Sequence, residues 1–196
     1  MAVSTISSVK IAGIATVVPS QSSPVGSSGG DADLSKVIAS TGVHSRRVSA
    51  PEVCTSDLCA KAAEVVLDGA HWDRDTVDLL IFVSQTPDQV LPATACLLHG
   101  RLGLSKQCAA FDVNLGCSGY VYGLSLASAH LQAGMATRVL LLVGDTISKI
   151  TSAKDRSVAY LFGDAGTATL LERNESAAPM NFITGTDGTG GAYLQV

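Results

Sequence analysis

Residues 109–134 decide the fold class, and their sequence is AAFDVNLGCSGYVYGLSLASAHLQAG. Ala109–Val113 predicts a short buried strand, which a tight turn joins to a helix over Gly116–Gly134. Apolar and small side chains recur along one stripe of that helix, at Val121, Leu124, Ala127, Ser128 and Leu131. The segment 117–134 contains no acidic or basic residue, and a helix without charge on any face is normally buried all round. We therefore expect a buried helix with Cys117 at its N-terminal end.

Apolar strands and helices alternate on both sides of this segment. Asp78–Gln85 and Arg138–Asp145 are nearly continuous apolar runs, the pattern of strands covered on both faces. Two further strands are predicted over Val9–Val18 and Ala165–Leu171, and a surface loop over Ser20–Asp33. One helix is predicted from a cap at Thr55 or Ser56 to Gly69, with Leu58, Ala62, Val65 and Val66 on one face. A second helix is predicted from Pro92 to Gly103. This alternation predicts an α/β domain with a mostly parallel central sheet and helices on both faces.

Composition narrows the range of partners. The 196 residues include 13 Lys and Arg against 17 Asp and Glu, a net charge of −4, which argues against a nucleic-acid-binding surface. The longest apolar runs, Leu79–Val83 and Val139–Val143, are far shorter than the roughly 18 residues of a membrane span, so we expect no membrane partner. Only 15% of residues are charged, against about 25% in an average soluble protein. Such a chain is expected to bury part of its surface against a partner.

Five cysteines lie at positions 54, 59, 96, 108 and 117. Their odd number and the lack of Cys/His ligand spacing predict neither a disulfide framework nor a metal site. The N-terminus shows no basic region followed by an apolar stretch, so no secretory signal is expected. A reducing cytoplasm is the expected compartment.

Cys117 is the candidate nucleophile among these cysteines. The positive end of a helix favours a thiolate, and its unpaired N–H groups can bind a developing oxyanion. Gly116 and Gly119 flank the thiol and are expected to leave room for a substrate near the backbone. The strand–turn–helix order is similar to the nucleophile elbow of other α/β enzymes. The other four cysteines are interpreted as inert buried thiols.

The run DVNLGCSGYVYGLSLASAHLQAG (112–134) strongly resembles the active-site segment of β-ketoacyl-acyl-carrier-protein synthase III, a thiolase-fold enzyme. Three other stretches fall in the family's order, namely STGVHSRR (40–47), LPATACLLHGRLGL (91–104) and AKDRSVAYLFGDAGTATLL (153–171). The resemblance implies that residues 1–196 form an N-terminal thiolase-like domain and that the second half of the family fold is absent from this chain.

The resemblance also implies a mechanism. Cys117 would accept the acyl group of an acyl-CoA, and an enolate from decarboxylated malonyl-acyl-carrier-protein would attack it to give a β-ketoacyl product. Acyl-CoA and the phosphopantetheine-linked carrier protein are substrates, and no separate cofactor is implied. The family's catalytic histidine and asparagine belong to the second half, and its His-Gln-Ala-Asn run does not occur here. The four histidines are interpreted as surface or helix-packing residues: His44, His71, His99 and His130.

Three positions bear on substrate recognition. The family sandwiches the CoA adenine between a tryptophan and an arginine; Arg156 falls at the arginine position, and Lys36 replaces the tryptophan. Trp72, the single tryptophan, is interpreted as a surface packing residue. Leu91 falls where the family often places a phenylalanine that closes the acyl pocket from the neighbouring subunit, which suggests either a differently shaped pocket or a packing role.

Two alternative functions remain open at this point. One is synthase-III-like acyl transfer to an oxygen or nitrogen nucleophile without decarboxylation, since Lys36 and Leu91 differ from the family pattern. The other is a non-catalytic partner subunit, because the chain lacks the second half. In each case a homodimer, or a partner chain that completes the fold, is expected.

Overall fold

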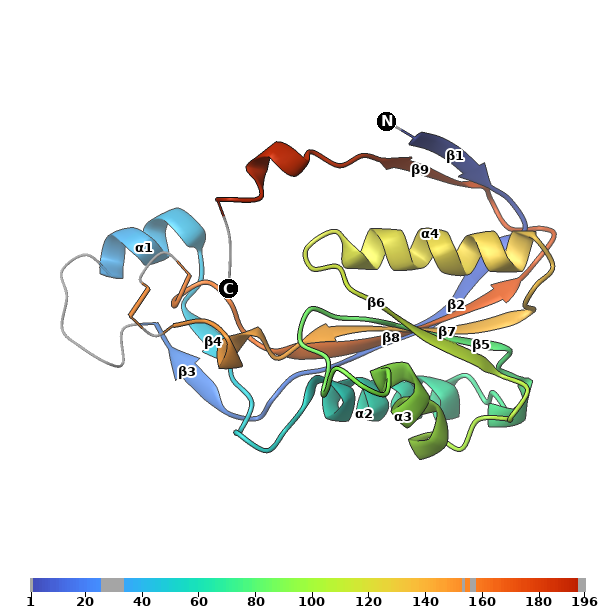
Figure 1. The fold of residues 1–196 in the computed structure, drawn as a ribbon, viewed down its shortest axis with the longest axis horizontal. Coiled ribbons are helices and arrows are strands. Elements are labelled where there is room, and N and C mark those ends of the chain that lie inside the picture. The colour runs from blue at the N-terminus through green and yellow to red at the C-terminus, as the bar shows by residue number, and fades with distance from the viewer. Residues whose placement is uncertain (1, 26–33, 153, 156–157, 194–196) are drawn as a thin grey trace.

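The computed structural model describes residues 2–25, 34–152, 154–155 and 158–193. A five-stranded sheet forms its centre, in the order β2-β8-β7-β5-β6 (Figure 1). These strands are β2 (Val9–Val17), β5 (Leu79–Val83), β6 (Ala109–Val113), β7 (Arg138–Asp145) and β8 (Ala165–Arg173). The predicted α/β class is thereby confirmed.

The sheet is mixed because β8 runs against its neighbours. β5 pairs in parallel with β6 and β7, whereas β8 pairs antiparallel with both β7 and β2, so four of the five strands share one direction. Within its described residues, the β7–β8 connection holds a short 3-10 turn, η2 (Ile147–Lys149), and no crossover helix. A parallel pairing needs such a crossover, which explains why β8 returns antiparallel beside β7.

Helices cover both faces of the sheet. α2 (Thr55–Gly69) and α3 (Thr94–Arg101) lie on one face, and α4 (Gly119–Gln132) lies on the other (Figure 1). All five residues of β5 are buried; Leu80 and Phe82 pack in the α2–α3 core, while Ile81 and Val83 pack in the α4 core. The apolar runs of β5 and β7 therefore belong to strands covered on both faces, as predicted.

Four short strands were not predicted. β1 (Ala2–Ile6) and β9 (Met180–Thr184) form an antiparallel ribbon on the α4 side of the molecule (Figure 1), where Ile6 and Phe182 join the α4 core. β3 (Ser22–Pro24) pairs with β4 (Ser45–Arg47), and α1 (Leu34–Thr41) lies between them in the chain. Part of the predicted loop at Ser20–Asp33 is thus a strand, and residues 26–33 lie outside the described part of the chain. The remaining turns are η1 (Arg74–Thr76) and η3 (Gly188–Gly190).

The predicted start of α2 is one residue late. Cys54 precedes the helix, and its backbone N–H donates to the Asp57 carboxylate at 2.7 Å. Thr55 and Ser56 are buried inside the first turn, and their hydroxyls donate to residues of another loop instead of capping the helix. Val65 was predicted on the buried face but is 52% exposed.

α3 begins at Thr94 rather than at Pro92. The Asp112 carboxylate of β6 accepts the backbone N–H groups of Thr94 and Ala95 at 2.8 and 2.7 Å, so a carboxylate from a distant strand satisfies the first turn. Trp72, predicted at the surface, is only 7% exposed, and the Arg138 guanidinium lies 4.5 Å from its ring centroid. No helix in the described ranges is long and apolar enough to cross a membrane.

Candidate functional site

Cys117 lies in the turn between β6 and α4 and is exposed to solvent. The backbone N–H of Gly119 donates to the carbonyl of Gly116 at 2.7 Å and closes this turn. Because α4 begins at Gly119, after an N-cap at Ser118, the thiol precedes the helix instead of belonging to its first turn as predicted. The positive end of the helix dipole is nevertheless the end next to Cys117.

α4 is only partly buried, in contrast to the prediction of burial on all sides. Gly123, Ala127 and Leu131 face the sheet, whereas Val121 is 47% exposed. The charge-free composition of this helix therefore gives it an uncharged exposed face as well as a buried one.

The two glycines that flank Cys117 allow close approach of other protein groups. A Cβ at Gly119 would lie 2.8 Å from Cγ1 of Val83, and a Cβ at Gly116 would overlap the side chain of Gln85. Both glycines therefore have a packing role, which sequence reasoning had not assigned to them. Their predicted contribution to substrate binding stays a prediction.

Asp145, at the end of β7, holds the loop that follows β5. Its Oδ1 accepts hydrogen bonds from the Ser84 hydroxyl at 2.9 Å, the Gln85 backbone N–H at 2.7 Å, and the Thr86 backbone N–H and hydroxyl at 3.0 and 2.9 Å. Sequence reasoning missed this network. The available signal was the polar run SQTPD (84–88) directly after one apolar strand and Asp145 at the end of another, since parallel strands end at the same sheet edge.

A cavity of about 360 Å³ opens beside this loop. Its polar lining includes three threonines joined by hydrogen bonds, Thr55, Thr86 and Thr146, together with Gln85, Asp88 and Lys149. Gln85 lines the cavity and also contacts Gly116. The cavity and the turn that carries Cys117 therefore meet at Gln85, although Cys117 itself does not line the cavity.

Comparison with known proteins shows what the chain is similar to. Residues 111–188 match the model of 3-oxoacyl-[acyl-carrier-protein (ACP)] synthase III. The β-ketoacyl-[acyl-carrier-protein] synthase III of Caldanaerobacter subterraneus subsp. tengcongensis is 40% identical over 155 residues, which are 79% of this chain and 46% of that protein. The chain is therefore similar to synthase III proteins over most of its own length.

Two solved structures of acyl-carrier-protein synthases show the same similarity. The crystal structure of a 3-oxoacyl-(acyl-carrier protein) synthase from Burkholderia xenovorans LB400 superposes with a TM-score of 0.94 at 43% identity, over 97% of this chain and 56% of that one. A synthase III from Thermus thermophilus gives a TM-score of 0.81 at 34% identity, over 93% of this chain and 57% of that one. The predicted thiolase-like fold is thereby confirmed. The chain spans about half the length of the relatives that it matches.

Lys36 and Leu91, two of the other predicted substrate contacts, are exposed at the surface. Lys36 is exposed on α1, and Leu91 is 83% exposed in the loop before α3, beside a fully exposed Val90. Lys36 and Leu91 do not line the cavity beside Gln85. Arg156 lies outside the described residues.

The other thiols of the chain differ in burial. Burial raises the pKa of Cys59 to about 12 and that of Cys108 to about 11, as expected of inert core thiols. Burial and the nearby Asp88 carboxylate raise the pKa of the half-buried Cys54. Cys96 was interpreted as buried but is exposed.

Two of the four histidines pack within the fold as predicted. The His99 Nε2 lies 2.8 Å from the Ser105 carbonyl oxygen, and the His130 Nδ1 lies 2.8 Å from that of Leu126. His44 and His71 are exposed. In the described ranges, no three His, Cys, Asp or Glu side chains cluster as a metal site would require.

Proposed function

We propose that the intact protein is an acyltransferase of the synthase III type and that Cys117 carries the acyl group. The supporting observation is an exposed thiol at the positive end of α4, in the segment that matches the synthase III family model. An exposed thiol beside a helix N-terminus suits nucleophilic catalysis, because both the attacking thiolate and the oxyanion formed on the substrate are stabilised there.

In the first step, the Cys117 thiolate attacks the carbonyl carbon of an acyl-CoA. A carbon–sulfur bond forms, the carbon–sulfur bond to CoA breaks, and the CoA thiolate leaves and takes up a proton. The backbone N–H of Cys117 provides part of the oxyanion hole for the tetrahedral intermediate.

In the second step, malonyl-acyl-carrier-protein loses CO₂, and the electron pair of the broken bond forms an enolate. The enolate carbon attacks the acyl carbonyl on Cys117 and releases the cysteine thiolate, which leaves a β-ketoacyl-carrier-protein. Residues outside this chain, in the intact protein or in a partner chain, stabilise the enolate; the chain spans less than half of its curated relative.

The predicted substrate contacts keep their roles in this proposal. Lys36 and Arg156 pair with the phosphates of CoA, and Leu91 contributes an apolar side chain to the acyl site across a dimer interface. The exposure of Lys36 and Leu91 supports roles that bring them against a ligand or a second subunit. Residues 1–196 then act as the N-terminal thiolase-like domain of a homodimer.

The test follows the acyl group by mass spectrometry. The intact protein is incubated with acyl-CoA; the expected result is one acyl adduct on Cys117 that is absent from Cys117→Ala. Cys96→Ala is the matched control, because it removes the other exposed thiol and is expected to keep the adduct. No adduct in the unaltered protein would refute the proposal.

A second measurement separates condensation from simple transfer. Adding malonyl-acyl-carrier-protein to the acylated protein is expected to release CO₂ together with a β-ketoacyl product. Loss of the acyl group to an amine or alcohol acceptor without CO₂ would show transfer without decarboxylation instead.

A further inference from the structure

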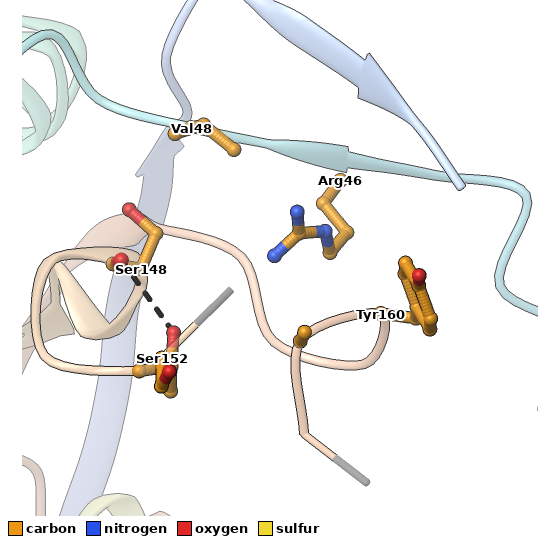
Figure 2. A pocket seen from close by; sticks show the side chains of 7 residues that line it. Arg46, Val48, Ser148, Ser152 and Tyr160 are labelled. Atoms are coloured by element: carbon orange, nitrogen blue, oxygen red, sulfur yellow. Dashed lines mark hydrogen bonds between the residues drawn. The ribbon is translucent and has the colours of Figure 1, made fainter. Parts of the chain in front are cut away.

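A second cavity, of about 180 Å³, lies between β4 and the β7–β8 connection (Figure 2). Arg46 of β4 extends into it, and the lining includes four hydroxyl-bearing residues: Ser148, Thr151, Ser152 and Tyr160. None of these residues lines the cavity beside Gln85. This second cavity is called the Arg46 pocket below.

The guanidinium of Arg46 is only partly satisfied. One terminal nitrogen, Nη1, donates to the carbonyl oxygen of Phe162 at 3.0 Å. The Nε–H is buried and has no hydrogen-bond partner. Among the described residues, no carboxylate forms an ion pair with Arg46. A buried, charged donor without an acceptor is unfavourable. Within the described part of the chain, the bond from Nη1 is the one hydrogen bond of this guanidinium, so the other terminal nitrogen, Nη2, is left to donate to a ligand in the pocket.

The hydroxyl groups around Arg46 differ in whether they can donate to a ligand, and that of Thr151 donates to the Ser148 carbonyl oxygen at 3.5 Å. The Ser152 hydroxyl oxygen accepts the Lys154 N–H at 3.2 Å, which leaves its own proton for a ligand. The Ser148 hydroxyl is already committed, because it donates to the Asp164 carboxylate at 2.7 Å. That carboxylate is 2% exposed and also accepts two backbone N–H groups, from Ser49 and Ser148, so its charge is stabilised by hydrogen bonds and it does not itself line the pocket.

We propose that the Arg46 pocket binds a tetrahedral oxyanion of the phosphate class. Its lining residues include one fixed cation, several hydroxyl groups and no carboxylate. A guanidinium is suited to this because its planar donors match the spacing of phosphate oxygens. The phosphate is either a free ion or the phosphate group of a larger molecule, and the chemistry of recognition is the same for both. This inference does not depend on acyl transfer at Cys117.

Calorimetric titration of the intact protein tests the proposal with three probes: inorganic phosphate, CoA and pantetheine, which lacks phosphate. Arg46→Gln is expected to weaken binding of the phosphate-bearing probe by about ten- to a hundredfold, the effect of one charge-assisted hydrogen bond. Arg47→Gln is the matched control. Arg47 is the next residue of β4 and is exposed, and its Nη1 donates to the carbonyls of Pro19 and Ser20. We expect less than a twofold effect from it.

The probes identify the source of the phosphate. Arg46-dependent binding of CoA, without binding of pantetheine, shows that the pocket takes a phosphate group of a larger ligand. Arg46-dependent binding of inorganic phosphate alone shows a free-anion site. Binding of both phosphate probes that is the same in Arg46→Gln and the unaltered protein would overturn the proposal, as would no binding of either.

Ser152→Asp is a second test of the proposal that stays informative if Arg46→Gln does not fold. Ser152 is exposed, so this change does not disturb the core, and it places a tethered carboxylate at the pocket. We expect an unchanged circular dichroism spectrum and loss of phosphate binding; retained binding would count against the proposal. Cys117→Ala is expected to bind the probes normally, so failure of the proposed acyl chemistry and failure of this inference give different results.

Discussion

Removal of the Asp145 carboxylate is expected to loosen the loop that contacts the Cys117 turn. One oxygen of this side chain accepts four hydrogen bonds, from Ser84, Gln85 and both donors of Thr86. The Ser84 residue is only 4% exposed, whereas Gln85 is exposed. Water can therefore replace the carboxylate for some of these donors but not for the buried hydroxyl.

The size of the effect follows from this count. A hydrogen bond to a charged group contributes about 1.5–3 kcal/mol, and we assume that water replaces half or more of the four. Asp145→Ala is then expected to lower the free energy of unfolding by about 2–4 kcal/mol. Asp145→Asn keeps an oxygen acceptor and is expected to lower it by about 1–2 kcal/mol. Asp68→Asn is the control, because its exposed ion pair with Arg74 contributes less than about 1 kcal/mol.

Two assays separate stability from positioning. Urea unfolding gives the change in free energy, and mass spectrometry gives the rate at which Cys117 is acylated by acyl-CoA. We expect Asp145→Ala to slow acylation by about tenfold or more, because a small displacement of a reacting group strongly lowers the reaction rate. Alkylation of the same thiol by iodoacetamide, which needs no positioning, should stay within twofold. Normal acylation in a folded Asp145→Ala protein would refute the positioning role.

Three further predictions concern packing and the thiols. In Gly123→Ala, the new Cβ would lie 2.8 Å from Cδ1 of Leu141. Overpacking of this kind costs about 1–3 kcal/mol, whereas the gain in helix propensity is roughly 1 kcal/mol, so the melting temperature should fall. Gly100→Ala in α3, with nothing within 4 Å of the new Cβ, should melt at the same temperature or higher. At neutral pH, iodoacetamide should label Cys96 and Cys117 in the folded protein, and Cys59 and Cys108 only after denaturation, as peptide mapping can show. The folded-state pKa of Cys59 is raised to about 12, so its contribution to stability is full below the unfolded value near 8.5 and is lost as pH rises toward 12. Urea unfolding should show this as a slope of up to about 1.4 kcal/mol per pH unit that is absent from Cys59→Ala.

The sequence predicts the strands of the central sheet better than the short strands β1 and β9. Arg138–Asp145 is a strand with the predicted bounds, because an apolar run covered on both faces leaves a strong local signal. Ala109–Val113 also has the predicted bounds, but it is an edge strand with no buried residue, so the prediction that it is buried was wrong. β1 and β9 were missed because their stability comes from pairing across the chain, as in Ala2 with Thr184. Both strands also carry exposed apolar side chains, such as Val3 and Ile183, which give no clear alternation.

In the site too, features formed by consecutive residues could be predicted, whereas contacts between residues far apart in the sequence could not. Strand, turn and helix around Cys117 are consecutive in the chain, so their order could be predicted from the residues themselves. The network around Asp145 joins residues about 60 positions apart, and the contact between Thr55 and Thr146 spans 91. Such contacts follow from strand order, which the sequence pattern alone does not provide.

The strand order explains how a carboxylate on β7 acts on a thiol that follows β6. β5 lies between them, so its C-terminal loop has β7 on one side and β6 on the other. On the first side Asp145 fixes the Gln85 backbone, and on the second the Gln85 side chain occupies the space that a Cβ at residue 116 would need. A change at either Gly116 or Asp145 must therefore reach the other through Gln85. Their effects on Cys117 acylation should be less than additive when the two changes are combined, whereas independent effects would add. A double-mutant cycle with Gly116→Ala and Asp145→Ala measures this coupling, and strict additivity would show that Gln85 does not connect the two positions.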